Sequence, residues 1–269
     1  MNQTIQVNDM EQTKSNLLDA PDRVMACILD IGEVLLKGGA EIMRVEDTLG
    51  RLCRAYGFAS SDVFTVTSCI ILTARLPAGD VMTQTRRVPA RGTDLDSVAR
   101  ANALSRRLCA RPVPLEEMQA EIAALRQGRS YPTWLQLLTW GVVSAAFSLF
   151  FGGTAMDACA AFCSGLVLFC AMTLGSRLRI NSILLSCLCS GLTALTVALL
   201  CAVGLGQHHD KIIIGNIMLL IPGMALTTSL RDVINGDTLS GMMGFFESIV
   251  KAMAVAIGPA VVLKLLGGF

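Results

Sequence analysis

Hydrophobic and polar positions follow two different periods in the first half of this 269-residue chain. From Ala20 to Gly57, apolar residues recur at helical spacing, which predicts a helix with a break at the Gly38-Gly39 pair. From residue 62 to residue 75, apolar and polar residues alternate, which predicts one continuous β-strand. The apolar face of that strand would consist of Phe64, Val66, Ile70 and Leu72.

The residues around this strand complete a small α+β domain over residues 20–130. Thr93 or Asp94 can cap the helix that follows the second strand. Residues 1–19 are polar and unpatterned, so we expect a disordered tail there. The remaining predicted elements are a turn at 77–80, a more polar strand over 81–89, and helices over about 95–109 and 115–127.

The second half of the chain is divided into apolar segments that contain few charges. About 20 apolar residues are enough to span the hydrocarbon core of a bilayer. Hydrophobic residues make up 53% of the chain, and 32 of its 43 charged residues precede residue 133. The sequence therefore predicts an α-helical multi-pass membrane protein, with five transmembrane helices in residues 131–269 and an N-terminal cytosolic α+β domain. The predicted spans are 134–151, 155–175, 181–205, 211–229 and 240–266.

The distribution of basic residues predicts the orientation of these spans. The polar first 20 residues contain no signal peptide, so we expect the N-terminal domain to stay in the cytoplasm. The turns on that side then carry Arg177, Arg179 and Arg231, whereas the opposite side carries Lys211 and Lys264. We expect a bacterial cytoplasmic (inner) membrane protein whose C-terminus lies outside, because five spans are an odd number.

Several function classes are excluded by what the sequence lacks. The net charge of +1 gives no reason to expect a nucleic-acid partner, and no phosphate loop or dinucleotide fingerprint indicates a cofactor. His208 and His209 are adjacent loop residues, a weak pattern for a metal, so we predict no metal site. Asp232 and Asp237 would suit a membrane-embedded hydrolase, but no nucleophile and base accompany them, so we do not expect an enzyme.

Polar groups in the fourth predicted span are candidates for substrate contact. Pro222 and Gly223 favour a kinked or broken helix, which either lines a substrate site or is a kink tolerated between packed helices. Asn216 needs a partner in an apolar setting and can offer its amide to a polar substrate. Thr227 and Thr228 either face substrate or bond back to their own helix.

Charged residues follow in the next turn and in the fifth span. Arg231, Asp232 and Asp237 are expected in a cytoplasmic turn, either as interfacial anchors or as contacts of the N-terminal domain. Glu247 and Lys251 are four residues apart in an apolar segment, a spacing that favours either a structural pair or a role in ion or substrate coupling.

The N-terminal domain carries its own charged motif beyond the glycine pair. Glu41 can pair with Arg44, as Asp47 can pair with Arg51, in solvated surface ion pairs. Alternatively, the motif docks against the membrane domain through a polar surface formed by Gly39, Glu41, Arg44 and Glu46.

Two stretches, residues 32–57 and 220–258, resemble the threonine/serine exporter family, and the order of domains is similar to its YjjP-type N-terminal component. The resemblance implies secondary export of small polar metabolites, such as threonine and serine or dicarboxylates including succinate. It also implies a separate YjjB-type small membrane subunit. The motif positions would be Gly39, Glu41, Arg44, Glu46, Pro222, Gly223, Arg231, Asp232, Gly236, Asp237, Ser240, Gly241 and Glu247.

These observations predict an oligomeric exporter subunit in the lipid bilayer that moves a small-molecule substrate, driven by the proton gradient. The alternative is a non-transporting scaffold or regulatory subunit, whose polar residues hold the partner.

Overall fold

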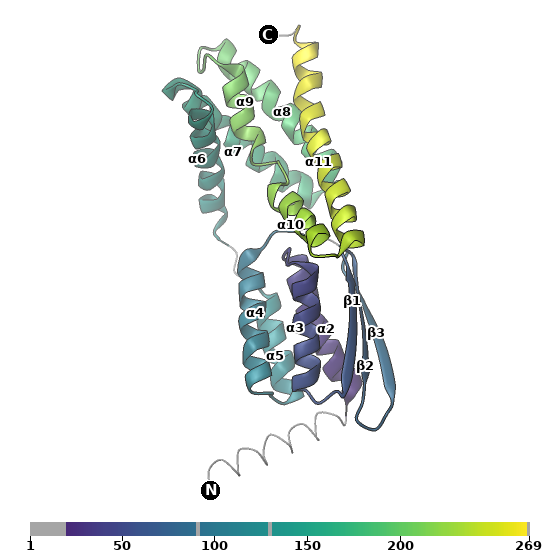
Figure 1. Ribbon diagram of the computed structural model, residues 1–269. Coiled ribbons are helices and arrows are strands. Elements are labelled where there is room, and N and C mark those ends of the chain that lie inside the picture. Colours follow the sequence, from purple (N-terminus) through teal and green to yellow (C-terminus); the bar gives the residue numbers. More distant parts are fainter. Residues whose placement is uncertain (1–19, 90–91, 129–130, 268–269) are drawn as a thin grey trace. The chain divides into compact units, whose positions relative to one another are not determined.

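The computed structural model describes residues 20–89, 92–128 and 131–267 (Figure 1). The expected disordered tail, residues 1–19, lies outside the described residues. The described residues form two units, which are treated separately below. The first unit contains the described residues up to 128 together with Met224–Phe245, and the second contains the rest.

Four helices form the core of the first unit, and their bounds agree with the hydrophobic periods. α2 (Pro21–Lys37) packs against α3 (Ile42–Ala55), α4 (Leu95–Ala110) and α5 (Leu115–Arg126). The predicted break at the glycine pair is confirmed, because it lies between the end of α2 and the start of α3. The largest fully buried side chains include Tyr56, Met25, Ile28, Leu35, Ile42, Leu49 and Leu52.

A three-stranded antiparallel sheet completes this unit, in the order β1 (Ser60–Val66), β2 (Cys69–Arg75) and β3 (Val81–Arg87). The prediction of one continuous strand over residues 62–75 is therefore wrong. Thr67 and Ser68 form a two-residue turn, and polar two-residue loops of this kind close hairpins. The alternation of apolar residues continues through that turn, so the sequence pattern did not reveal it.

The hairpin also reverses which residues share a face. Thr65 pairs with Ile70 and Phe64 with Ile71, so Thr65 lies on the face of Ile70 and Leu72 and Phe64 lies on the other. Phe64 is accordingly 55% exposed and Thr65 only 2% exposed. The sheet thus presents the backbone of a buried threonine on β1, which is an edge strand.

The second unit consists of long apolar helices. α6 (Thr133–Phe150), α7 (Ala155–Arg177), α8 (Ser182–Ala202) and α11 (Thr238–Leu265) are each long and apolar enough to cross a membrane. They correspond to four of the five predicted spans. The short α9 (His209–Ile217) packs against α6, α7 and α8. The chain is therefore a multi-pass membrane protein with four candidate spanning helices among the described residues.

The fourth predicted span is split in the structure. α9 ends at Ile217 and α10 (Gly223–Ile234) begins only after Pro222, so the break that the proline predicted is present. α10 also extends further than the sequence indicated. Arg231 and Asp232 were predicted in a turn between two spans, but they lie in the last turn of α10. Gly236, at φ +100°, makes the actual turn into α11.

Small residues allow α8 and α11 to approach closely in the second unit. A Cβ atom at Gly258 would overlap with the carbonyl oxygen of Cys187 and with Oγ of Ser190. Such contacts between small residues are the usual means by which helices associate in lipid. Lipid tails are as apolar as the helices themselves, so no hydrophobic driving force holds the helices together.

Candidate functional site

The charged motif of the N-terminal domain begins with a glycine that shapes the start of α3. Gly39 has φ +89°, and a Cβ atom there would lie 2.8 Å from the carbonyl oxygen of Gly92. Its role is therefore to let the chain turn closely past a neighbouring loop. Glu41 follows with extended backbone as the N-cap of α3, but its side chain caps no N–H group of that helix.

Asp232 supplies the carboxylate that α3 lacks at its start. Its Oδ1 accepts a hydrogen bond from the backbone N–H of Ile42 at 3.4 Å, across 190 residues of sequence. The Asp232 side chain is buried, at 1% exposure. A negative charge at this position is favoured by the unpaired N–H groups and the dipole at a helix N-terminus.

Glu41 is turned outward to the neighbouring arginine on α10. Nη1 of Arg231 lies 2.7 Å from Oε1 of Glu41, and the arginine side chain is 63% exposed. The expected local pair between Glu41 and Arg44 is thus replaced by a pair with a distant residue. Because solvent screens it, this ion pair contributes at most about 1 kcal/mol. The expected pair of Asp47 with Arg51 is present at 2.9 Å.

Glu46 and Ser240 bind the two backbone groups of Thr65. Oε1 of Glu46 accepts from the Thr65 N–H at 2.7 Å, and Oγ of Ser240 donates to the Thr65 carbonyl at 3.2 Å. These bonds satisfy polar groups of an edge strand, which would otherwise be unpaired. Residues 231–240, which we call the docking segment, therefore contact both α3 and β1.

The docking segment also places a second carboxylate near Glu46. Burial raises the pKa of Glu46 above its ordinary value of 4.5, and the charge of Asp237 raises it further, while the hydrogen bond from Thr65 lowers it. The raised pKa means that Glu46 takes up a proton at a higher pH than an ordinary glutamate does.

Not all motif residues belong to these contacts. Arg44 is exposed and lines a separate cavity between α3 and α4. Thr227 is exposed on α10, and Oγ1 of Thr228 donates to the carbonyl of Met224 at 3.0 Å, a bond back to its own helix. Pro222 and Gly223 lie at the start of α10, where they separate it from α9.

Asn216 lies in the second unit and is fully buried on α9. Its Nδ2 donates to Oγ of Ser164 at 2.7 Å and to the carbonyl of Ile212 at 2.9 Å. Its Oδ1 has no hydrogen-bond partner among the described residues, nor have the hydroxyl oxygens of Ser144 and Ser148 on the adjacent α6. Buried polar atoms without partners are costly, so these three residues are candidates for contact with a polar substrate.

Glu247 and Lys251 lie on α11, where the glutamate is exposed and the lysine is half-buried. No ion pair joins them among the residues that the structure describes. The other exposed side chains of α11 are mostly apolar and include Phe246, Val250 and Met253. An exposed carboxylate on such a surface is a candidate for a functional role.

One buried acid was missed by the sequence interpretation. Asp157 at the start of α7 accepts hydrogen bonds from the backbone N–H groups of Thr154 at 2.8 Å, Gln207 at 2.6 Å and His208 at 3.0 Å. Nδ1 of His208 lies 2.8 Å from its Oδ2. The Thr-x-x-Asp capping pattern at residues 154–157 was the available signal. His208 therefore anchors a loop, and the described residues contain no cluster that would bind a metal.

Comparison with known proteins gives matches that cover most of the chain. The profile of a family described as "Putative threonine/serine exporter" matches residues 26–266. A protein of Mycobacterium tuberculosis named "Probable threonine/serine exporter" is 22% identical over 244 residues, which are 90% of this chain and 46% of that protein. This chain thus spans about half the length of that relative. An Escherichia coli protein named "Probable succinate transporter subunit YjjP" is 25% identical over 244 residues, covering 89% of this chain and 93% of that protein. No solved structure matches the chain.

Proposed function

Because this chain belongs to the threonine/serine exporter family, we propose that it is a subunit of a secondary exporter for small polar metabolites. The family consists of exporters and not of enzymes. Together with the apolar helices, membership makes the chain a multi-pass protein of the inner membrane. The proposed substrates are threonine and serine or dicarboxylates such as succinate, the classes named in its two relatives.

The observation that carries this proposal is the break between α9 and α10. The two helices contain 9 and 12 residues. Together they have about as many residues as the roughly 20 that a spanning helix needs. Discontinuous helices of this kind line the substrate site in many secondary transporters. We therefore count α9 and α10 as one broken span, which gives five crossings.

Five crossings set the proposed orientation. The N-terminal domain would lie in the cytoplasm, with Arg177, Arg179 and Arg231 on the same side, and the C-terminus would lie outside. The docking segment then joins the cytoplasmic end of the broken span to α3 and β1, which supports a gating role for the cytosolic domain.

Glu247 is the proposed coupling group for protons. It is exposed on α11 of a single chain, so a carboxylate in an apolar surface would become buried against another subunit. A carboxylate at such a position can take up and release a proton during transport. The word "subunit" in the name of the Escherichia coli relative supports a second component, for which a YjjB-type small membrane protein is proposed.

The test is transport in reconstituted vesicles, with and without the second component, using threonine, serine and succinate under an imposed pH gradient. Glu247→Gln should lower gradient-driven flux at least tenfold, and the matched control Lys264→Gln, near the other end of α11, should leave it unchanged. Normal flux in Glu247→Gln would remove this residue from the mechanism. Absence of gradient-driven flux for all three substrates in the wild-type complex would contradict the proposal itself.

The exposure of Glu247 is equally compatible with the alternative, a scaffold that only holds the partner. It predicts that Glu247→Gln or Asp232→Asn abolishes co-purification of the second component. Retention of the partner together with loss of flux would favour the transporting role.

A further inference from the structure

A cavity of about 480 Å³ lies between α3 and α4, within the first unit. It is formed by one face of each helix, with Arg44, Asp47 and Arg51 on α3 and Asn102 and Arg106 on α4. Its volume is in the range of small-molecule sites. Neither the docking contacts nor the membrane helices use it.

The charges that line this cavity do not cancel. Arg51 is paired with Asp47 at 2.9 Å. Among the described residues, Arg44 and Arg106 take part in no ion pair. Three guanidinium groups and one carboxylate therefore leave a net charge of about two positive units around the cavity.

A buried amide adds a second, independent feature. Asn102 is only 8% exposed, and its side chain lines the cavity. The hydroxyl of the neighbouring Ser105 is already used, because its Oγ donates to the Asn102 carbonyl at 3.0 Å. The Asn102 amide can therefore donate a hydrogen bond to a ligand oxygen in the cavity.

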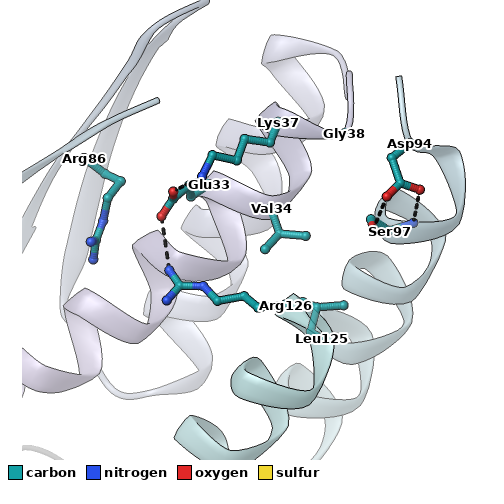
Figure 2. Close-up of a pocket in the computed structure, with 9 residues that line it drawn as sticks. All are labelled: Glu33, Val34, Lys37, Gly38, Arg86, Asp94, Ser97, Leu125 and Arg126. Atoms are coloured by element: carbon teal, nitrogen blue, oxygen red, sulfur yellow. Dashed lines mark hydrogen bonds and ion pairs between the residues drawn. The ribbon is translucent and has the colours of Figure 1, made fainter. Parts of the chain in front are cut away.

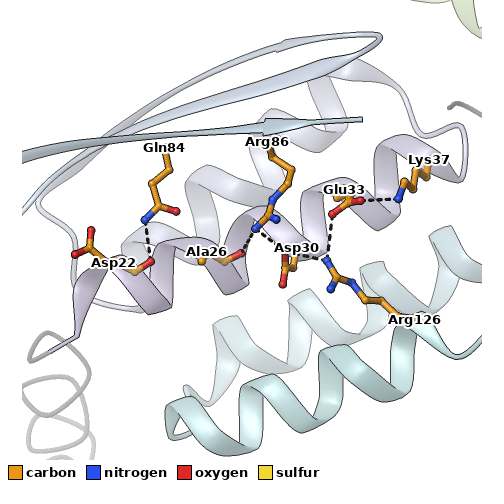
Figure 3. Close-up of polar contacts among 8 residues, drawn as sticks. All are labelled: Asp22, Ala26, Asp30, Glu33, Lys37, Gln84, Arg86 and Arg126. Carbon is orange, nitrogen blue, oxygen red and sulfur yellow. Dashed lines mark hydrogen bonds and ion pairs between the residues drawn. The ribbon is translucent and has the colours of Figure 1, made fainter. Parts of the chain in front are cut away.

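A larger cavity in the same unit differs in that its cations are all engaged in ion pairs. It measures about 690 Å³ and is lined by Lys37, Arg86 and Arg126, among others (Figure 2). Each of these cations has an acidic partner within the protein, although the three share two carboxylates (Figure 3). Lys37 pairs with Glu33, Arg86 with Asp30, and Arg126 with both acids.

We propose that the cavity between α3 and α4 binds a small organic or inorganic dianion. Guanidinium groups match the planar, bidentate geometry of carboxylates and phosphates, and two unpaired arginines correspond to two negative charges. The ligand is therefore either a short dicarboxylate or a phosphate group. This site is separate from the proposed transport path and binds without a gradient.

Its position connects it to the docking contacts through α3. The two arginines of the cavity on α3, Arg44 and Arg51, lie within the first three turns after Ile42, whose N–H group donates to Asp232. An anion that joins Arg44 to Arg106 would hold α3 against α4. Occupancy should therefore slow hydrogen exchange in both helices, a consequence that binding at a site in the membrane helices would not have.

The test is titration calorimetry on the full-length protein in detergent, with disodium succinate and inorganic phosphate as separate probes at constant ionic strength. One probe should bind saturably, and the stronger of the two identifies the carboxylate or the phosphate class. Arg106→Gln should weaken binding about tenfold or more, since a hydrogen bond to a charged group contributes about 1.5–3 kcal/mol. The matched control Arg54→Gln removes an exposed arginine of α3 that does not line the cavity, and it should bind like the wild type.

Three results would overturn the proposal. They are no saturable binding of either probe, equal affinity in wild type and Arg106→Gln, and no ligand-dependent protection of α3 and α4 in hydrogen exchange. Arg44→Gln provides a second removal of charge from the same cavity. Glu247→Gln should retain binding, so a failure of the transport proposal leaves this test unaffected.

Discussion

Removal of the Asp232 carboxylate tests whether the docking segment stabilises the start of α3. Asp232→Ala deletes the acceptor for the Ile42 N–H, and substitution of a helix cap costs about 0.5–2 kcal/mol. The distance of 3.4 Å is long for a hydrogen bond, which places the direct loss near the lower part of that range. The lost interaction with the helix dipole adds about 0.3–1 kcal/mol.

The sum of about 1–2 kcal/mol corresponds to a 5- to 30-fold increase in local opening at the first turn of α3, since about 1.4 kcal/mol is tenfold. Hydrogen–deuterium exchange with mass spectrometry on the full-length protein measures this directly, in peptides that begin several residues before Ile42 and include the first turn of α3. Asp232→Asn keeps an acceptor oxygen and should give an intermediate rate.

The matched control is Asp96→Ala, which removes an exposed carboxylate from the first turn of α4, where it pairs with Arg100. It should leave exchange in α3 at the wild-type rate. If Asp232→Ala folds normally and exchange at the start of α3 is unchanged, Asp232 does not cap this helix and the reasoning is refuted.

Three further predictions concern neighbouring contacts. Because its pKa is raised in the folded state, Glu46 contributes stability that is fully present below its unfolded-state pKa and is lost as the pH rises through its folded-state pKa. Glu46→Gln should therefore flatten the fall in melting temperature above pH 4.5. An unchanged pH profile of the melting temperature would contradict this. A double-mutant cycle with Glu41→Gln and Arg231→Gln should give a coupling energy of at most about 1 kcal/mol that shrinks in high salt, whereas a larger, salt-independent value would indicate a buried pair. Asp157→Ala removes the acceptor of three backbone N–H groups and should destabilise the full-length protein by about 3 kcal/mol, seen as a clearly lower melting temperature; an unaltered melting temperature would refute an anchoring role.

The local pattern of the sequence was sufficient for most helices. The spacing of apolar residues and the glycine pair gave α2 and α3, and the apolar segments gave α6, α7, α8 and α11 within a few residues. These features depend only on near neighbours in sequence, namely helical periodicity, caps and charge-free length. Pro222 likewise indicated the end of a helix, because a proline removes a hydrogen bond wherever it stands in a helix.

The hairpin shows where a local pattern is insufficient. Alternation across residues 62–75 does not distinguish one strand from two strands joined by a two-residue turn. Only the pairing of β1 with β2, and the packing of β1 on α3, decided that Thr65 points inward and Phe64 outward.

The sequence by itself determined the membrane class, the broken fourth segment and the charged residues that needed partners. The tertiary structure decided which partners they have. Asp232 caps a helix that begins 190 residues earlier, and Glu41 pairs with Arg231 rather than with Arg44. Such contacts join residues that sequence spacing does not relate. They exist because folding brings the docking segment to the N-terminal end of α3, which has unpaired N–H groups, and to the edge strand β1.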